Sequence, residues 1–310
     1  MATPTKKSRA GAVRKSRLYW GVPVALVGVV LVVLLARWLV GTPAGESFLA
    51  DYPGQSELPA GAPVGLPAWL GWQHFLNGFL LLLIIRSGWQ VRTTARPSGH
   101  WTRNNKGFIR TKNSPATITL ELWFHLFLDV LWILNGLVFA VLIFTTGQWM
   151  RIVPTSWDIF PNAVSAALQY ASLDWPTENG WVNYNALQLL SYFLTVFIAA
   201  PLAFATGIRM SGVWPKKAPA LNRAYPLELA RAVHYPVMIY FVIFIVIHVF
   251  LVLATGALRN LNHMYAASDG EGLLGLWIFL ASVAVMAGAW FLARPIFLRP
   301  IAALMGKVSR

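Results

Sequence analysis

Long apolar stretches alternate with polar and charged connections along the chain. A transmembrane helix requires about 20 consecutive, mainly apolar residues. Six stretches of that length are found, at roughly 18–40, 66–86, 119–146, 186–208, 232–256 and 273–293. The first stretch is too long for the apolar part of a signal peptide, so it is expected to remain as an anchor. The pattern predicts an all-α integral membrane protein with six transmembrane helices.

Basic and acidic residues lie in different connections between these stretches. Of the 25 Lys and Arg residues, 22 lie in the N-terminal segment, the second and fourth connections and the C-terminal tail. Eight of the 11 acidic residues lie in the other three connections. Because basic connections stay in the cytoplasm, both termini are expected there. The net charge of +14 then reflects topology and contact with membrane lipid, and no nucleic-acid partner is expected.

The composition excludes several further classes of protein. Hydrophobic residues make up 57% of the chain and charged residues 12%, about half the charged share of a soluble domain. With no Cys, the chain has no disulfide, iron–sulfur cluster, thiolate zinc site, c-type haem attachment or Cys nucleophile.

The outer connections 41–65 and 147–185 are long and rich in Pro, Gly, Trp and Asn, so we expect them to form a platform for an extracytoplasmic partner.

Four of the six histidines lie inside the predicted helices. An imidazole in hydrocarbon usually faces the interior of a helix bundle and has a partner there. His74 lies near the outer end of the second helix, and His248 lies in the outer part of the fifth. His125 and His234 both lie near the inner ends of their helices. The depths therefore predict two histidine pairs, one in each leaflet.

The spacing within the fifth helix supports this arrangement. His234 and His248 are 14 residues apart, which is about 21 Å along a helix axis and brings the side chains to within about 40° of one direction. Two facing imidazoles at each of two depths suit the two axial positions of a haem iron, whereas a zinc site gathers its ligands at one depth. Three glycines are expected either to admit a flat macrocycle or to serve close helix packing: Gly71, Gly78 and Gly136.

Two further residues are candidates with more than one interpretation. Asp129 lies one helical turn beyond His125. It is expected to accept the His125 Nδ1–H, to pass protons in quinone chemistry, or to bond to a neighbouring polar side chain. His263 lies in the last outer connection, where an ordinary loop histidine is favoured over a substitute ligand or a residue that lines a quinone or partner surface.

Three segments carry a resemblance to a known family. They are WLGWQHFLNGF with His74, LELWFHLFLDV with His125, and RAVHYPVMIYFVIFIVIHVF with His234 and His248. This pattern is similar to the bacterial di-haem cytochrome b subunits of formate dehydrogenase, nickel–iron hydrogenase and thiosulfate reductase, often grouped as cytochrome b561-like. The resemblance covers roughly 66–256 and implies a four-helix di-haem bundle, to which the first and sixth helices are additions.

The resemblance implies a cofactor set and a role. Two b-type haems would be held without covalent bonds, one by His74 and His248 as iron ligands in the outer leaflet and the other by His125 and His234 in the inner leaflet. Such a subunit carries electrons in a respiratory chain of the bacterial cytoplasmic membrane, between quinone and an extracytoplasmic redox subunit of the molybdenum or nickel–iron class. It is an electron-transfer subunit of an oxidoreductase rather than a catalyst alone.

Four segments follow from this interpretation: a basic cytoplasmic N-terminus, an extra helix with its outer loop, the di-haem core, and a last loop, helix and basic tail. Their bounds are 1–17, 18–65, 66–256 and 257–310.

Four arginines near the inner face are candidates for neutralising haem propionates, or simply reflect the positive-inside bias: Arg86, Arg92, Arg96 and Arg231. A stand-alone di-haem oxidoreductase linked to quinone and a non-redox transporter remain alternative functions.

Overall fold

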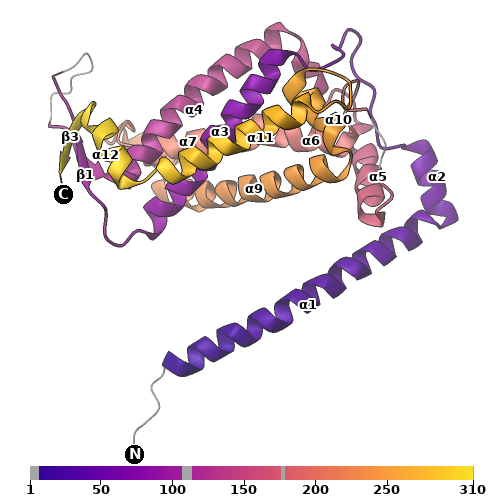
Figure 1. The fold of residues 1–310 in the computed structure, drawn as a ribbon, viewed down its shortest axis with the longest axis horizontal. Helices are drawn as coiled ribbons and strands as arrows, with labels where there is room; N and C mark the ends of the chain where they lie inside the picture. The colour runs from indigo at the N-terminus through magenta and orange to yellow at the C-terminus, as the bar shows by residue number, and fades with distance from the viewer. Residues whose placement is uncertain (1–6, 107–113, 176–178, 310) are drawn as a thin grey trace, which may run out of the picture. The chain divides into compact units, whose positions relative to one another are not determined.

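The structure is a computed structural model that describes residues 7–106, 114–175 and 179–309 (Figure 1). Within these residues, six helical segments are long and apolar enough to cross a membrane, as the sequence predicts. These segments are Gly21–Val40, Ala68–Thr93, Leu120–Thr145, Ala186–Met210, Leu227–Ala254 and Leu274–Leu292. The chain is therefore an all-α, multi-pass membrane protein. The second and fifth segments extend further toward their basic ends than the apolar pattern alone indicated.

The chain divides into two compact units. The first comprises Met1–Pro59, Val153–Asn179 and Asn183–Ser191, and the second comprises Ala60–Ile152, Gly180–Val182 and Tyr192–Arg310. Most of the long connection after the third transmembrane helix thus packs with the first helix and with the start of the fourth. The division runs through the fourth transmembrane segment.

In the first unit, the predicted outer loops contain helices. α1 (Lys7–Val40) packs against α5 (Ile159–Ser172), and α2 (Pro43–Asp51) follows α1 directly. Arg37, the charge inside the first apolar stretch, donates from Nε to the carbonyl oxygen of Ser172 at 2.9 Å. The Thr42 hydroxyl accepts from the backbone N–H of Gly45 at 3.1 Å and so caps α2.

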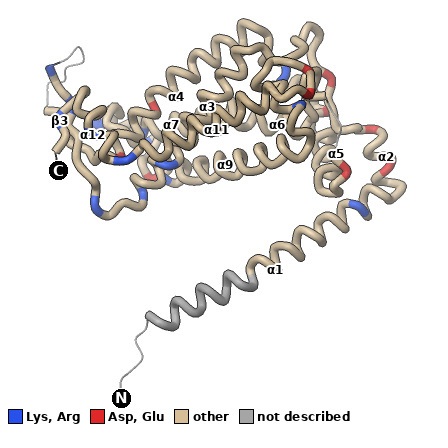
Figure 2. Tube along the Cα trace, viewed as in Figure 1, with Lys and Arg blue, Asp and Glu red and all other residues tan. Residues whose placement is uncertain are grey.

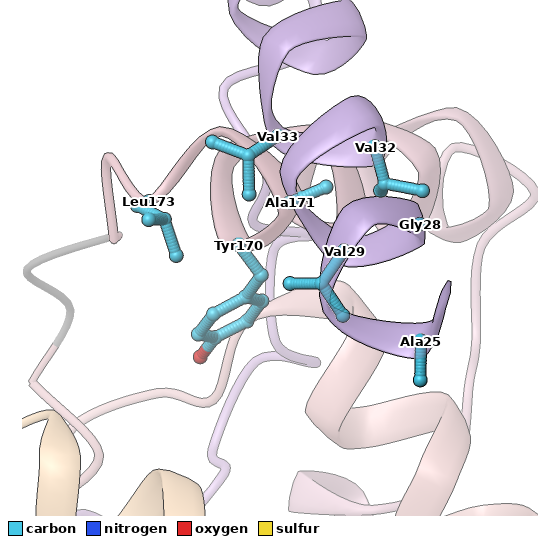
Figure 3. A pocket seen from close by; sticks show the side chains of 8 residues that line it. All are labelled: Ala25, Gly28, Val29, Val32, Val33, Tyr170, Ala171 and Leu173. Atoms are coloured by element: carbon cyan, nitrogen blue, oxygen red, sulfur yellow. The ribbon is translucent and has the colours of Figure 1, made fainter. Parts of the chain in front are cut away.

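An apolar hollow lies between α1 and α5 in this unit (Figure 3). Its lining is aliphatic except for the ring of Tyr170, whose hydroxyl accepts from Asn185 Nδ2 at 2.8 Å. Val29 and Val33 form the α1 side of the hollow. No charged residue lines it, which suits contact with lipid chains.

The second unit is built on three helices that carry the predicted histidines and on the later part of the fourth transmembrane segment (Figure 1). α3 (Ala68–Thr93) packs on α4 (Leu120–Thr145), and α7 (Ala200–Met210) packs on α9 (Leu227–Ala254). The fourth segment begins with α6 (Ala186–Phe193) and passes through the π-helical turn η2 (Leu194–Ala199) before α7. Leu80, Leu83 and Leu128 are buried between α3 and α4. α11 (Leu274–Leu292) packs on α3 from outside this bundle.

A small antiparallel sheet, which the sequence did not predict, closes one end of the second unit. Its order is β2 (Thr117–Thr119), β1 (His100–Arg103), β3 (Gly306–Ser309), so the second connection and the C-terminal tail pair with each other. The Trp101 indole donates to the Ala302 carbonyl oxygen of α12 (Pro295–Ala303) at 3.0 Å. Lys and Arg gather at this end, here called the basic end, which also includes α8 (Pro219–Ala224) (Figure 2).

The opposite end of the second unit is closed by buried polar contacts. η1 (Gln148–Arg151), α10 (Ala257–Leu261) and the π-helical turn η3 (Asn262–Ala266) lie there. Arg151 is 1% exposed, and its guanidinium donates to the carbonyl oxygens of Gly65 at 2.8 Å and Gly180 at 2.6 Å. These bonds fix segments that are far apart in the sequence, because a buried guanidinium without acceptors is strongly unfavourable.

Candidate functional site

The four histidines inside the membrane helices form two pairs in the second unit. His74 on α3 and His248 on α9 have ring centres 6.1 Å apart. His125 on α4 and His234 on α9 have ring centres 6.4 Å apart. These are the two combinations expected from their depths. We call His125 and His234, at the basic end, the inner pair, and His74 and His248 the outer pair.

The separation of the rings fits a shared metal ion. A metal ion lies about 2.0 Å from an imidazole nitrogen and about 1.15 Å separates that nitrogen from its ring centre, so two rings on opposite sides of one ion have centres about 6.3 Å apart. The two observed separations, 6.1 and 6.4 Å, bracket this value. Both ring separations are therefore compatible with one ion placed between the two imidazoles.

A hydroxyl group fixes the proton of His125. The Nδ1 atom of His125 lies 2.9 Å from Ser87 Oγ on α3. The Ser87 hydroxyl donates its only proton to the carbonyl oxygen of Ile84 at 3.0 Å, so it accepts from the imidazole. Nδ1 then carries the ring proton and Nε2 keeps its lone pair. This is the tautomer in which Nε2 can bind a metal ion.

The partner histidine has the same arrangement from a different helix. The Nδ1 atom of His234 lies 2.8 Å from Thr206 Oγ1 on α7. The Thr206 hydroxyl donates to the carbonyl oxygen of Leu202 at 2.6 Å, and Thr206 is 1% exposed. Both imidazoles of the inner pair are thus held by a hydroxyl that is itself anchored to a helix backbone.

A glycine follows each of these hydroxyl residues and gives the imidazole room. A Cβ atom on Gly88 would lie 3.2 Å from His125 Cε1, and one on Gly207 would lie 3.9 Å from His234 Cε1. The sequence interpretation missed these Ser-Gly and Thr-Gly pairs, although a polar and small dipeptide inside an apolar helix is a visible signal.

The three glycines chosen from the sequence do not pack on the imidazoles. Gly71 lies directly against the carbonyl oxygen of Met264, so it serves close packing with η3. A Cβ atom on Gly78 or Gly136 would meet nothing within 4 Å. The close-packing interpretation therefore holds for Gly71, whereas the role of Gly78 and Gly136 in admitting a macrocycle stays a prediction.

Aromatic side chains surround the outer pair. The Phe244 ring stacks on His248 with centres 5.5 Å apart and planes 6° apart, and the Tyr192 ring meets His248 edge-on at 6.0 Å. Tyr265 of η3 meets His74 edge-on at 5.7 Å. Among the described residues, nothing bonds to the buried Nδ1 atom of His74. The outer pair thus lies in an apolar cage with one polar atom that the chain leaves unsatisfied.

The interpretation of Asp129 as acceptor for the His125 Nδ1–H is wrong, because Ser87 occupies that nitrogen. Asp129 lies on the other side of the ring, with Oδ2 3.8 Å from His125 Nε2. Its carboxylate is 28% exposed and faces the inner pair. A role in moving protons near this pair stays a prediction.

Two of the four candidate arginines, Arg86 and Arg92, contact aromatic rings. The Arg92 guanidinium lies 4.0 Å over the ring of Tyr235, which follows His234 on α9. Arg92 is therefore near the level of the inner pair along α9, although Tyr235 points to a different side of that helix than His234. Arg86 instead lies over Trp290 on α11, at 5.2 Å.

His263 is a buried, bonded residue rather than an ordinary loop histidine. It is 4% exposed, and its Nε2 atom lies 2.7 Å from Asp269 Oδ1. Its ring centre lies 5.4 Å from that of Trp181. Since the nitrogen is already engaged, the structure gives no support to His263 as a substitute metal ligand.

No protein-family model matches the chain, and neither a curated protein nor a solved structure gives a match. Within the described residues, His, Asp and Glu form no group of three or more that could hold a metal ion. The histidines thus stand as two separate pairs, and their geometry is the basis for assigning a function.

Proposed function

We propose that the chain is a di-haem b-type cytochrome of a bacterial cytoplasmic membrane, with both termini in the cytoplasm. It carries electrons between quinone and an extracytoplasmic oxidoreductase in respiration. The observation that supports this proposal is the occurrence of two imidazole pairs, at ring separations of 6.1 and 6.4 Å, each of which joins the membrane-crossing helix α9 to another such helix. The absence of Cys from the sequence agrees with haem that is held without thioether bonds.

The chain's residues would bind and orient the two groups. When bound, each haem supplies a one-electron redox centre. His125 and His234 present neutral Nε2 atoms because Ser87 and Thr206 hold the Nδ1 protons. Arg92, which lies over Tyr235 near the same level of α9, is the candidate for meeting a propionate.

The two pairs give electrons a route along α9. His234 and His248 are separated by 14 residues, about 21 Å of helix, so the proposed groups lie in opposite leaflets. Between these levels, Trp132 and Phe241 meet edge-on at 6.4 Å and fill the space between α4 and α9.

The two ends of the second unit suit electron exchange with different partners. We propose that the redox subunit docks at the end that Arg151 closes, next to the outer pair. Quinone would then exchange electrons with the inner pair near the cytoplasm, where Asp129 would handle protons. Electrons that start outside would move inward, and quinone protons would be taken up inside, so both movements separate charge in the same sense.

The first experiment is a haem count on the purified full-length protein. We expect two haems per chain, all released by acidified acetone, and a reduced-minus-oxidised spectrum of the b type. His100→Ala, a histidine of the basic-end sheet, is the matched control and should retain both haems. One haem per chain, or none, would overturn the proposal and favour a transporter with structural or proton-relaying histidines.

Co-purification distinguishes the two redox interpretations. A subunit that serves an outside oxidoreductase should be recovered with a second redox protein when membranes are solubilised gently. Reduction of the haems by quinol, without any such protein, would instead indicate a stand-alone quinone-linked oxidoreductase. Cross-links from a partner to the basic end alone would contradict the proposed docking side.

A further inference from the structure

Arg86 lies on the side of α3 that faces away from the histidine pairs. It follows His74 by 12 residues, which turns its side chain about 120° around the helix axis. It points instead toward α11, where its guanidinium lies 5.2 Å from the ring centre of Trp290. Arg86 is therefore available for a role outside the proposed haem sites.

The Arg86 guanidinium lacks an anionic partner. Its Nη1 atom is buried and has no hydrogen-bond partner among the described residues. A second cation, Arg294, lies four residues beyond Trp290, over which the Arg86 guanidinium lies, and its charge opposes that of Arg86. Within the described parts of the chain, neither guanidinium lies within 4.0 Å of a carboxylate. Two neighbouring cations with an unused buried donor form a site that favours an anion.

The surface around Arg294 is strongly apolar. Phe291 is 63% exposed at the end of α11, and Ile296 is 72% exposed at the start of α12. The opposite face of α12 is buried through Leu298 and Ala302, so this helix keeps one apolar side outward. The Arg294 guanidinium lies 6.0 Å from the Phe291 ring centre. Cations and exposed apolar side chains thus occur together where α11 leaves the membrane.

We propose that Arg86 and Arg294 bind the phosphate of an anionic phospholipid, whose acyl chains lie on the apolar surface of Phe291 and Ile296. Guanidinium groups pair with phosphate through two parallel hydrogen bonds, and basic pockets between transmembrane helices are suited to lipid headgroups. A soluble phosphate would use the two arginines but not the exposed apolar side chains. The surface therefore favours a lipid over a free anion.

The proposed lipid also gives the sixth transmembrane helix a function. This helix packs on η3 at its start, around Gly275, and only 6% of the residues in its membrane segment are buried within the protein. A phosphate shared by Arg86 of α3 and Arg294 beyond α11 would join these helices at the basic end. This inference is independent of the haem proposal, because neither arginine contacts a histidine pair.

Lipid binding to the delipidated full-length protein tests the proposal. We expect native mass spectrometry to show retained phosphatidylglycerol, bound about tenfold more tightly than phosphatidylcholine with the same acyl chains. Arg86→Gln and Arg294→Gln should each weaken phosphatidylglycerol binding by about tenfold, as expected for losing charge-assisted hydrogen bonds. Arg86→Lys should give an intermediate loss, since lysine keeps the charge but not the two-pronged geometry.

Two controls make the outcome decisive. Lys217→Gln removes one charge from an exposed position of the same basic end and should leave binding unchanged. An equal loss in Lys217→Gln would show unspecific attraction and overturn the site, as would equal binding of the two lipids. Inorganic phosphate that competes at the affinity of phosphatidylglycerol would overturn the lipid assignment. If Arg86→Gln does not fold, the exposed Arg294→Gln variant carries the same test.

Discussion

The inner and outer histidine pairs have nearly the same ring separation but different surroundings. The inner pair is held by hydrogen bonds from Nδ1 to Ser87 and Thr206. The outer pair is held by ring contacts, with Phe244 stacked on His248 and Tyr265 edge-on to His74. One spacing is thus achieved by two kinds of packing, polar in one leaflet and aromatic in the other.

This difference predicts different properties for the two sites. A hydrogen bond at Nδ1 makes an imidazole a stronger electron donor and fixes the ring's orientation. An apolar cage fixes the ring by shape but leaves its electronic character unchanged. We therefore expect the hydroxyl groups to tune the inner site, and the aromatic residues to control access to the outer site.

The largest expected effect is the loss of one site at a time. His125→Ala and His234→Ala should each remove the inner haem, and His74→Ala and His248→Ala should each remove the outer one, because one imidazole rarely suffices for a bis-histidine site. The haem content should fall from two to about one per chain, with matching spectra and redox titrations within each pair. A spectrum of His74→Ala that matched His234→Ala would refute the pairing.

The next effect concerns the space beside the inner pair. Gly88→Val should displace His125, since even a Cβ atom there lies 3.2 Å from the ring. Overpacking of this kind costs about 1–3 kcal/mol, so we expect partial loss of the inner haem and a lower thermal midpoint. The outer haem should remain. Gly288→Val on α11 is the matched control, because a Cβ atom there would meet nothing within 4 Å.

The spans and depths of the site were predictable from the sequence, and the local bonds were not. Length and hydropathy fix six helices, and the positions of His125 and His234 along their helices fix a common level. The Ser87 contact depends on the rotation of α3 against α4, which no periodicity in a uniformly apolar helix reveals. Asp129 was therefore assigned to the wrong nitrogen.

Connections between helices were predicted less well for a related reason. In the sheet of three strands, β1 pairs with β3 from about 200 positions further along the chain, and strands of three or four residues carry no clear alternation. Burial of His263 likewise depends on a turn that brings Asp269 back to it. Long-range contacts decide both, and local patterns do not encode them.

A smaller effect is expected on the midpoint potential of the inner site. It distinguishes hydrogen bonding by the Ser87 and Thr206 hydroxyls from simple packing. Ser87→Ala and Thr206→Val remove the acceptors of the inner imidazole protons, so the imidazoles donate less to iron and the inner midpoint potential should rise. A hydrogen bond worth about 1 kcal/mol limits the rise to about 40 mV for one electron. Potentiometric titration measures it, and the outer potential is the internal control. A fall, or an equal rise at both sites, would contradict the tuning role.

The smallest effect is the response of the outer pair to alkaline pH. Burial raises the pKa of Tyr265 above its usual value of 10.0. A phenol whose pKa is higher in the folded protein adds stability that is complete below about pH 10 and is lost as the pH rises through the folded pKa. Deprotonation would place a negative charge against the His74 ring, so the outer haem spectrum should change above pH 10 while the inner one persists.

Tyr265→Phe should remove this change and leave haem binding at neutral pH intact, whereas Tyr225→Phe at the basic end should behave like the wild-type protein. An alkaline transition that survives in Tyr265→Phe would show that the aromatic cage does not control the outer site through this residue.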